Sequence, residues 1–185
     1  TVYWHSHEEP ETLPRFIGKG VRYADFKMGG PDFPLAKVIV EFGLLSDKPV
    51  EVKGVKVAPR DVFLALVPPT PSMEEMERMI NAGTISMRGC IAVDVKGQKE
   101  NAKMRYILYT FFPDVQELLK RMPGANPVAY VTSVPASTFT KMLVKGEVKT
   151  RGVIPPEALK PEVRQLFLAE LAKKGITVQE KVERF

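Results

Sequence analysis

YVTSVPASTFTKMLVKGEVKTRGVIPPEAL, residues 130–159, is the segment around which the chain is organised. The apolar run at residues 128–134, which leads into it, predicts a buried strand. After Pro135, residues 136–144 carry apolar side chains at helical spacing and predict a helix. Gly146 ends this helix. The predicted order is therefore a buried strand, a proline break and an amphipathic helix.

Thr132 and Ser133 would lie where this predicted strand meets the helix. Hydroxyl groups and free N–H groups at a helix N-terminus converge on whatever lies above the strand end, so a ligand could bind there. The alternative is that Ser133 or Ser137 simply caps the helix. The sequence leaves both interpretations open.

Periodicity and turn signals predict the other elements of the chain. Five further helices are expected. One is capped by Asp32, one begins with a capping box of Ser72 and Glu75, and the others are residues 60–67, 114–122 and 162–174. The expected strands are residues 21–27, a hairpin around Lys53-Gly54, residues 85–96 and 104–112 joined by a polar loop at 97–103, and residues 176–182. Hairpins and helices alternate without a strict βαβ repeat, so we predict an α+β fold with a mixed, largely antiparallel sheet flanked by helices.

Composition is ordinary for a globular protein, with 44% hydrophobic and 26% charged residues among 185. No apolar run is long enough to span a membrane, and the first residues show no signal-peptide pattern. A single cysteine, Cys90, excludes an internal disulfide and predicts a cytoplasmic protein. The net charge of +5 is spread among acidic residues, so we expect no nucleic-acid partner.

Residues 1–11 are expected to form an N-terminal arm or linker, and residues 12–185 a domain. Because Thr1 is not an initiator methionine, we expect a piece of a longer protein. His5 and His7 lie two residues apart beside acidic residues and could hold a metal ion if the segment were extended. No third histidine completes a usual site, so we expect an exposed arm and no metal.

Several catalytic motifs are missing from the sequence. It contains no GxGxxG turn, no CxxC pair, no HExxH helix and no GxSxG elbow. Cys90 is far in sequence from both histidines, which favours a buried, inert thiol over a catalytic one. The motifs alone therefore give no complete active site, and no catalytic residue is predicted.

Five short segments nevertheless occur in a recognisable order: TLPRFIG, APRDVF, MRGCIAVDVKG, YVTSVPASTFTKMLVKGEV and TRGVIPPEAL. Together they resemble the C-terminal domain of saccharopine dehydrogenase-like oxidoreductases, a family that includes saccharopine reductases, lysine 6-dehydrogenases and carboxynorspermidine dehydrogenases. The resemblance covers residues 12–176, which is nearly the whole chain.

The resemblance implies a fold similar to the catalytic domain of glyceraldehyde-3-phosphate dehydrogenase. It implies that NAD or NADP is bound by an N-terminal Rossmann domain missing from these residues, so the isolated chain should be inactive. The implied partners are that Rossmann domain, a small amino-acid substrate and a second copy of the chain in a homodimer. The implied substrate is an amino acid or amino-dicarboxylate of lysine or polyamine metabolism.

On this resemblance, Arg15 and Arg88 are expected to bind substrate carboxylates, because a guanidinium group forms two parallel hydrogen bonds with a carboxylate. Thr132 and Ser133 are expected to add hydroxyl contacts. The alternative for each arginine is a surface ion pair.

A second functional hypothesis is a non-catalytic binding or assembly module that keeps the fold without the chemistry. Codons upstream of Thr1 that encode a strand, GxGxxG and a helix would favour the oxidoreductase. An initiator close to Thr1 would favour the module.

Overall fold

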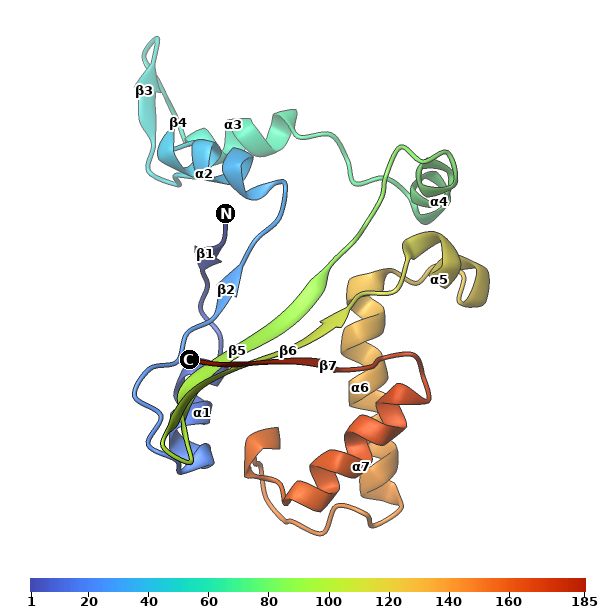
Figure 1. Ribbon diagram of the computed structural model, residues 1–185. Helices are drawn as coiled ribbons and strands as arrows, with labels where there is room; N and C mark the ends of the chain where they lie inside the picture. Colours follow the sequence, from blue (N-terminus) through green and yellow to red (C-terminus); the bar gives the residue numbers. More distant parts are fainter. The chain divides into compact units, whose positions relative to one another are not determined.

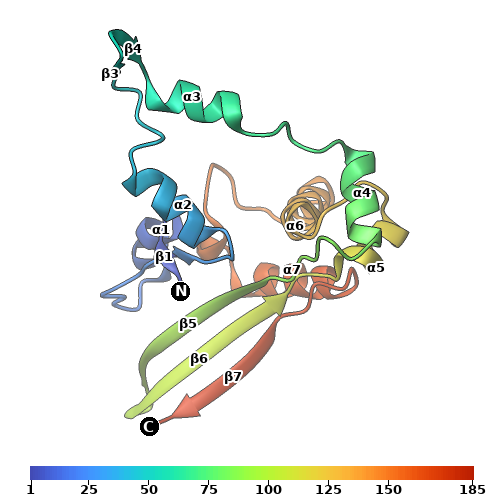
Figure 2. The same ribbon diagram turned by 90° about the horizontal axis from the view of Figure 1, so that it is seen from above.

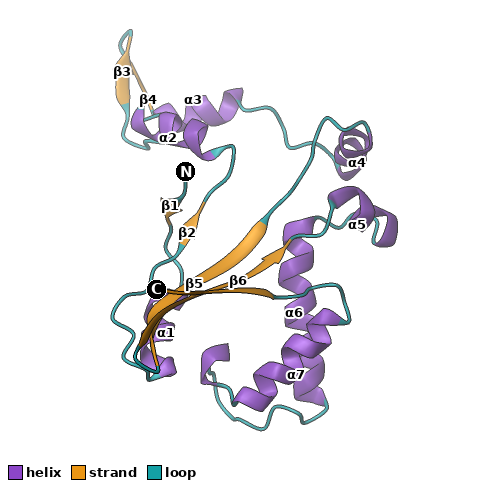
Figure 3. Ribbon diagram, in the orientation of Figure 1, coloured by secondary structure: helices purple, strands orange, loops and turns teal.

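The computed structural model describes all 185 residues, Thr1–Phe185. It divides into two compact units, Thr1–Thr70 and Pro71–Phe185, each of which is described by itself (Figure 1). The chain contains both helices and strands, and every strand pair is antiparallel (Figure 3). The predicted α+β class is confirmed. The structure contains no helix that could span a membrane.

The first unit consists of two short strand pairs and three helices. In chain order these are β1 (Tyr3–Trp4), α1 (Glu9–Ile17), β2 (Lys27–Met28), α2 (Phe33–Glu41), β3 (Val50–Val52), β4 (Val55–Val57) and α3 (Pro59–Leu66). The predicted hairpin is confirmed, because Lys53 and Gly54 take the positive φ angles, 52° and 81°, that a tight two-residue turn requires. The predicted strand at residues 21–27 is wrong except at Lys27, because only Lys27 and Met28 form a strand here, β2.

Side chains in the first unit are all at least partly accessible. None of residues 1–70 is buried, and α2 and α3 expose large apolar side chains such as Phe42 and Leu66. An amphipathic helix is stabilised mainly by burying its apolar face. The first unit therefore has no hydrophobic core of its own.

The second unit carries the long strands and most of the helices. Its elements are α4 (Met73–Asn81), β5 (Cys90–Lys99), β6 (Ala102–Phe111), α5 (Val115–Arg121), α6 (Pro127–Val144), the 3₁₀ turn η1 (Pro156–Ala158), α7 (Pro161–Ala172) and β7 (Gln179–Arg184). The strands form one antiparallel sheet in the order β5-β6-β7. Two views show α5, α6 and α7 at one end of this sheet (Figures 1 and 2).

The hydrophobic core of the second unit is formed by helices rather than by the sheet. One cluster contains Leu118, Tyr130, Leu171 and Ile176, and the other contains Met142, Val148 and Leu159. The Phe167 ring packs against both clusters. The Tyr130 hydroxyl donates a hydrogen bond of 2.7 Å to the Lys174 carbonyl and so ties the start of α6 to the end of α7.

The predicted strand at residues 128–134 is wrong, because these residues form the first half of α6. Asn126 caps the helix by accepting a 2.7 Å hydrogen bond from the Ala129 N–H, and Pro127 occupies the first turn, where a proline is favoured. Pro135 lies inside the helix instead of breaking it. Neither Ser133 nor Ser137 is the cap.

The sheet differs from prediction in its turn and in the environment of its cysteine. The polar loop expected at residues 97–103 is a tight turn, with Glu100 and Asn101 at positive φ between the paired residues Lys99 and Ala102. Cys90, expected to be a buried thiol, is exposed at the first position of β5. The reason is that no helix of the second unit packs on β5, all of whose residues are exposed.

Gly89 and Gly97 provide a matched test of sheet packing. The Phe112 ring lies against Gly89, where an added Cβ would meet a ring carbon at 2.4 Å, whereas a Cβ at Gly97 would meet nothing within 4 Å. We predict that Gly89→Ala lowers stability by about 1–3 kcal/mol through overpacking. Gly97→Ala should change it by less than about 1 kcal/mol. Equal losses in denaturant unfolding would contradict this account.

Candidate functional site

The structure places the two arginines that were expected to bind carboxylates in different units. Arg15 lies on α1 of the first unit, exposed, with its guanidinium carbon 5.8 Å from the centre of the Phe16 ring. Arg88 lies in the segment before β5 of the second unit and is also exposed. The ion pairs of the chain include neither residue, so neither forms the surface pair that was the alternative.

Thr132 and Ser133 are consecutive residues on α6, and both are exposed. The Thr132 hydroxyl donates to the Val128 carbonyl at 2.8 Å, and the Ser133 hydroxyl donates to the Ala129 carbonyl at 2.6 Å. They are therefore in the body of a helix, not at its N-terminus, and no free helix N–H groups surround them. Their hydroxyls keep lone pairs that can accept a hydrogen bond.

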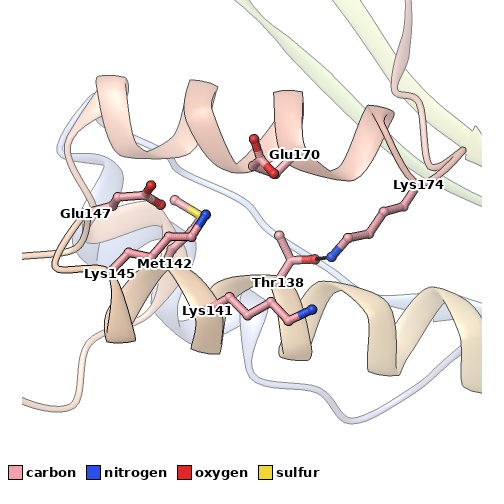
Figure 4. A pocket seen from close by; sticks show the side chains of 7 residues that line it. All are labelled: Thr138, Lys141, Met142, Lys145, Glu147, Glu170 and Lys174. Atoms are coloured by element: carbon pink, nitrogen blue, oxygen red, sulfur yellow. Dashed lines mark hydrogen bonds between the residues drawn. The ribbon is translucent and has the colours of Figure 1, made fainter.

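Between α6 and α7 the structure forms a crevice that the sequence interpretation missed. Its volume is about 150 Å³, and its lining is Thr138, Lys141, Met142, Lys145, Glu147, Glu170 and Lys174 (Figure 4). Thr138, Lys141 and Met142 of α6 and its C-cap residue Lys145 recur at intervals of three, one and three, which places them on one face of the helix. That spacing is present in the sequence and could have revealed a mixed polar face beside the apolar one.

Lys174 is held at this crevice by a buried hydroxyl. Thr138 is only 3% exposed; its hydroxyl donates to the Val134 carbonyl at 2.7 Å and accepts a hydrogen bond from the Lys174 ammonium. Glu170 pairs with Lys173, and that hydrogen bond is the main cause that lowers the pKa of Glu170, with Lys145 and Lys174 adding to it. Lys141, Lys145 and Lys174 have no carboxylate partner within 4.0 Å. Glu147 and Glu170 line the same crevice, so its charge is mixed.

A second group of charges crosses the sheet. Arg105 on β6 donates two hydrogen bonds to the Asp94 carboxylate of β5, at 2.9 and 2.8 Å, and one to Glu183 of β7 at 3.2 Å. The Arg105 hydrogen bonds lower the pKa of Asp94, and the hydrogen bond from Lys181, followed by that from Arg105, lowers the pKa of Glu183. Arg105 thus connects both edge strands, β5 and β7, to the central strand β6, so its role is structural.

Near the N-terminus, His7, Glu8 and Glu9 are the one group of possible metal ligands, with ligand atoms within 4.8 Å of one another. The hydrogen bond between His7 and Glu9 is the main cause that raises the pKa of His7, and the His7 ring stacks on Phe26 with centroids 4.1 Å apart. His5, the second histidine considered from the sequence, is not in this group. Three neighbouring, accessible residues do not make a usual tetrahedral site.

Comparison with known proteins gives a match to the family of saccharopine dehydrogenase C-terminal domains over residues 4–176. The chain belongs to this family. The resemblance drawn from the five sequence segments is thereby confirmed.

Two curated relatives are similar to the chain over most of its length. Carboxyaminopropylagmatine dehydrogenase of Synechocystis sp. is 28% identical over 184 residues, which is 95% of this chain and 41% of the relative. Carboxynorspermidine synthase of Vibrio cholerae is 28% identical over 164 residues, which is 87% of this chain and 37% of the relative. The chain thus spans about two fifths of the length of these relatives.

The Arg105 network predicts a pH dependence of stability. Because the folded state lowers the pKa of Asp94 from 3.8, the ionised carboxylate contributes stability at neutral pH that is lost as the pH falls through the lowered pKa. We predict that Asp94→Asn lowers the Tm at pH 7, and that its difference from the parent protein shrinks below about pH 4. The control is Asp47→Asn, because Asp47 is exposed and forms no ion pair. A difference for Asp94→Asn that does not change with pH would contradict the assignment.

Proposed function

We propose that this chain is the substrate-binding and dimerisation domain of an NAD(P)-dependent saccharopine dehydrogenase-like oxidoreductase. The observation that carries the proposal is the family match over residues 4–176. The names of both relatives describe carboxylated polyamines or their relatives, so a substrate of polyamine metabolism is favoured over one of lysine metabolism.

Such a substrate carries carboxylate and amine groups together, and the chain has groups suited to each. Arg15 and Arg88 are exposed and outside any ion pair, so their guanidinium groups are available to bind carboxylates. Thr132 and Ser133 already donate their hydroxyl protons to their own helix. Their proposed role is therefore to accept a hydrogen bond from a substrate ammonium group.

The cofactor is proposed to bind outside these 185 residues. They contain no glycine-rich GxGxxG turn between a strand and a helix, so they do not fit the pyrophosphate of a dinucleotide, and we derive no step through the cofactor. The same observation favours the second candidate function, a non-catalytic binding or assembly module. An upstream reading frame that encodes a dinucleotide-binding turn would decide for the oxidoreductase.

Arginine-to-lysine variants in the full-length protein test the substrate contacts. Arg15→Lys or Arg88→Lys keeps the charge but loses the second hydrogen bond to the carboxylate. We predict a loss of about 1.5–3 kcal/mol, or roughly tenfold to a hundredfold in kcat/KM, with little change in Tm. Thr132→Val is the companion variant, because it keeps the shape and removes the hydroxyl.

The matched control is Arg22→Lys, since Arg22 is another exposed arginine of the first unit with no ion pair and no predicted role. Its kcat/KM should equal that of the parent protein. Unchanged kcat/KM in Arg15→Lys, Arg88→Lys and Thr132→Val together would end the proposed site.

A further inference from the structure

The three-stranded sheet leaves one long strand edge without a partner. The order β5-β6-β7 places β5, which is ten residues long, at the edge of the sheet (Figure 2). The Phe112 N–H donates to the Gly89 carbonyl at 2.8 Å, so Gly89 and every second residue after it face β6. The backbone N–H and C=O groups of Ala92, Asp94, Lys96 and Gln98 therefore point to the open edge.

The two edges of the sheet differ in composition. β7 is six residues long and four of them are charged, Glu180, Lys181, Glu183 and Arg184, whereas three of the ten residues of β5 are charged, Asp94, Lys96 and Lys99. A short edge strand with a high density of charge disfavours pairing with another chain. β5 instead exposes Ile91, Val93 and Val95, each 47–48% accessible, on the face of the sheet opposite to Asp94. A long edge strand rich in β-branched residues is a template for a further strand.

We propose that β5 pairs antiparallel with β5 of a second copy of this chain, with the twofold axis passing at Val95. This proposal rests on the dimerisation role proposed above and names its interface. The axis sets Asp94 opposite Lys96 of the partner subunit, and Lys96 opposite the partner subunit's Asp94. Opposite charges directly across an antiparallel pair are stabilising, and this register forms two such pairs.

The neighbouring registers lack this complementarity. An axis at Asp94 would set the two copies of Asp94 against each other, and an axis at Lys96 would do the same for Lys96; like charges directly opposite are destabilising. With an axis at Val93, only residues 90–96 of β5 would pair with their copies, whereas with the axis at Val95 residues 91–99 pair. The register at Val95 therefore combines the longer overlap with paired charges.

Pairing in this register would satisfy the open edge and extend the sheet. The residues at positions 92, 94, 96 and 98 would exchange about eight backbone hydrogen bonds with the partner subunit. Two three-stranded sheets would become one of six strands. The exposed side chains of Ile91, Val93 and Val95 would then continue across the axis as one apolar face.

A cysteine at the axis tests the register directly. In a Cys90→Ser background, Val95→Cys would place the new thiol opposite its own copy in the partner subunit. The two positions form a non-hydrogen-bonded pair with Cα atoms about 4.5 Å apart, within the range that a disulfide bridges. At the control position, Val93→Cys would lie four residues out of register from its copy, roughly 13 Å away along the strand.

We predict that mild oxidation cross-links the Val95→Cys variant into a dimer and leaves the Val93→Cys variant largely monomeric on a denaturing gel. Cross-linking of the Val93→Cys variant alone would overturn the register.

A charge reversal tests the paired charges without a covalent bond. Lys96→Glu replaces two attractive pairs by two repulsive ones and should raise the Kd of the dimer at least roughly tenfold in sedimentation equilibrium. Lys103→Glu is the matched control, because it changes the same charge on the same face of the sheet but on the central strand β6. Its Kd should equal that of the parent chain.

The outcomes also separate this interface from the dimerisation role itself. A chain that is dimeric in sedimentation, with no cross-link at Val95→Cys and no effect of Lys96→Glu, would overturn the β5 interface and leave dimerisation through another surface. A chain that sediments only at 20.7 kDa across the micromolar range would overturn both. The substrate-binding role would then be judged by the arginine variants alone.

Discussion

The packing of α6 against α7 is the interaction on which the second unit depends. The Phe167 ring contacts both hydrophobic clusters and meets the Phe139 ring edge to face, with centroids 5.8 Å apart. The Tyr130 hydroxyl bonds to the Lys174 carbonyl at the end of the helix pair and so fixes where the chain leaves α7 for β7. The same packing builds the lysine-lined crevice, because Thr138 and Lys174 approach each other only when the two helices are in contact. The crevice is thus a product of the core.

Local signals in the sequence predicted the elements that depend on neighbouring residues. The Ser72–Glu75 capping box forms with both reciprocal hydrogen bonds, and Asp114 caps α5 through the N–H groups of Gln116 and Glu117. These interactions lie within one turn of helix, so a few consecutive residues supply both the donor and the acceptor. The strands of the long hairpin were likewise predicted, because the alternation of side chains along β5 and β6 is independent of what covers them.

Tertiary context explains what the sequence did not reveal. The run at residues 128–134 is apolar enough for a buried strand, yet it is helical because its cap at Asn126 and its partner α7 select the helix. Cys90 has the sequence neighbours of a buried thiol, but its burial depends on a covering element that β5 lacks. Of the predicted site residues, Thr132 and Ser133 are consecutive on α6, and Arg15 lies in a different unit from them. Residue type indicated which side chains could bind a carboxylate, but not where they meet.

We propose that the full-length protein acts on a carboxylated polyamine, the class of compound that the names of its two relatives describe. The most direct test is to express the complete reading frame and to follow NAD(P)H absorbance with carboxynorspermidine, carboxyaminopropylagmatine and saccharopine as substrates in parallel. We expect nicotinamide-dependent turnover with at least one of the two carboxylated polyamines, at a higher kcat/KM than with saccharopine. No turnover of any of the three with either NAD or NADP would contradict it, and so would turnover of saccharopine alone.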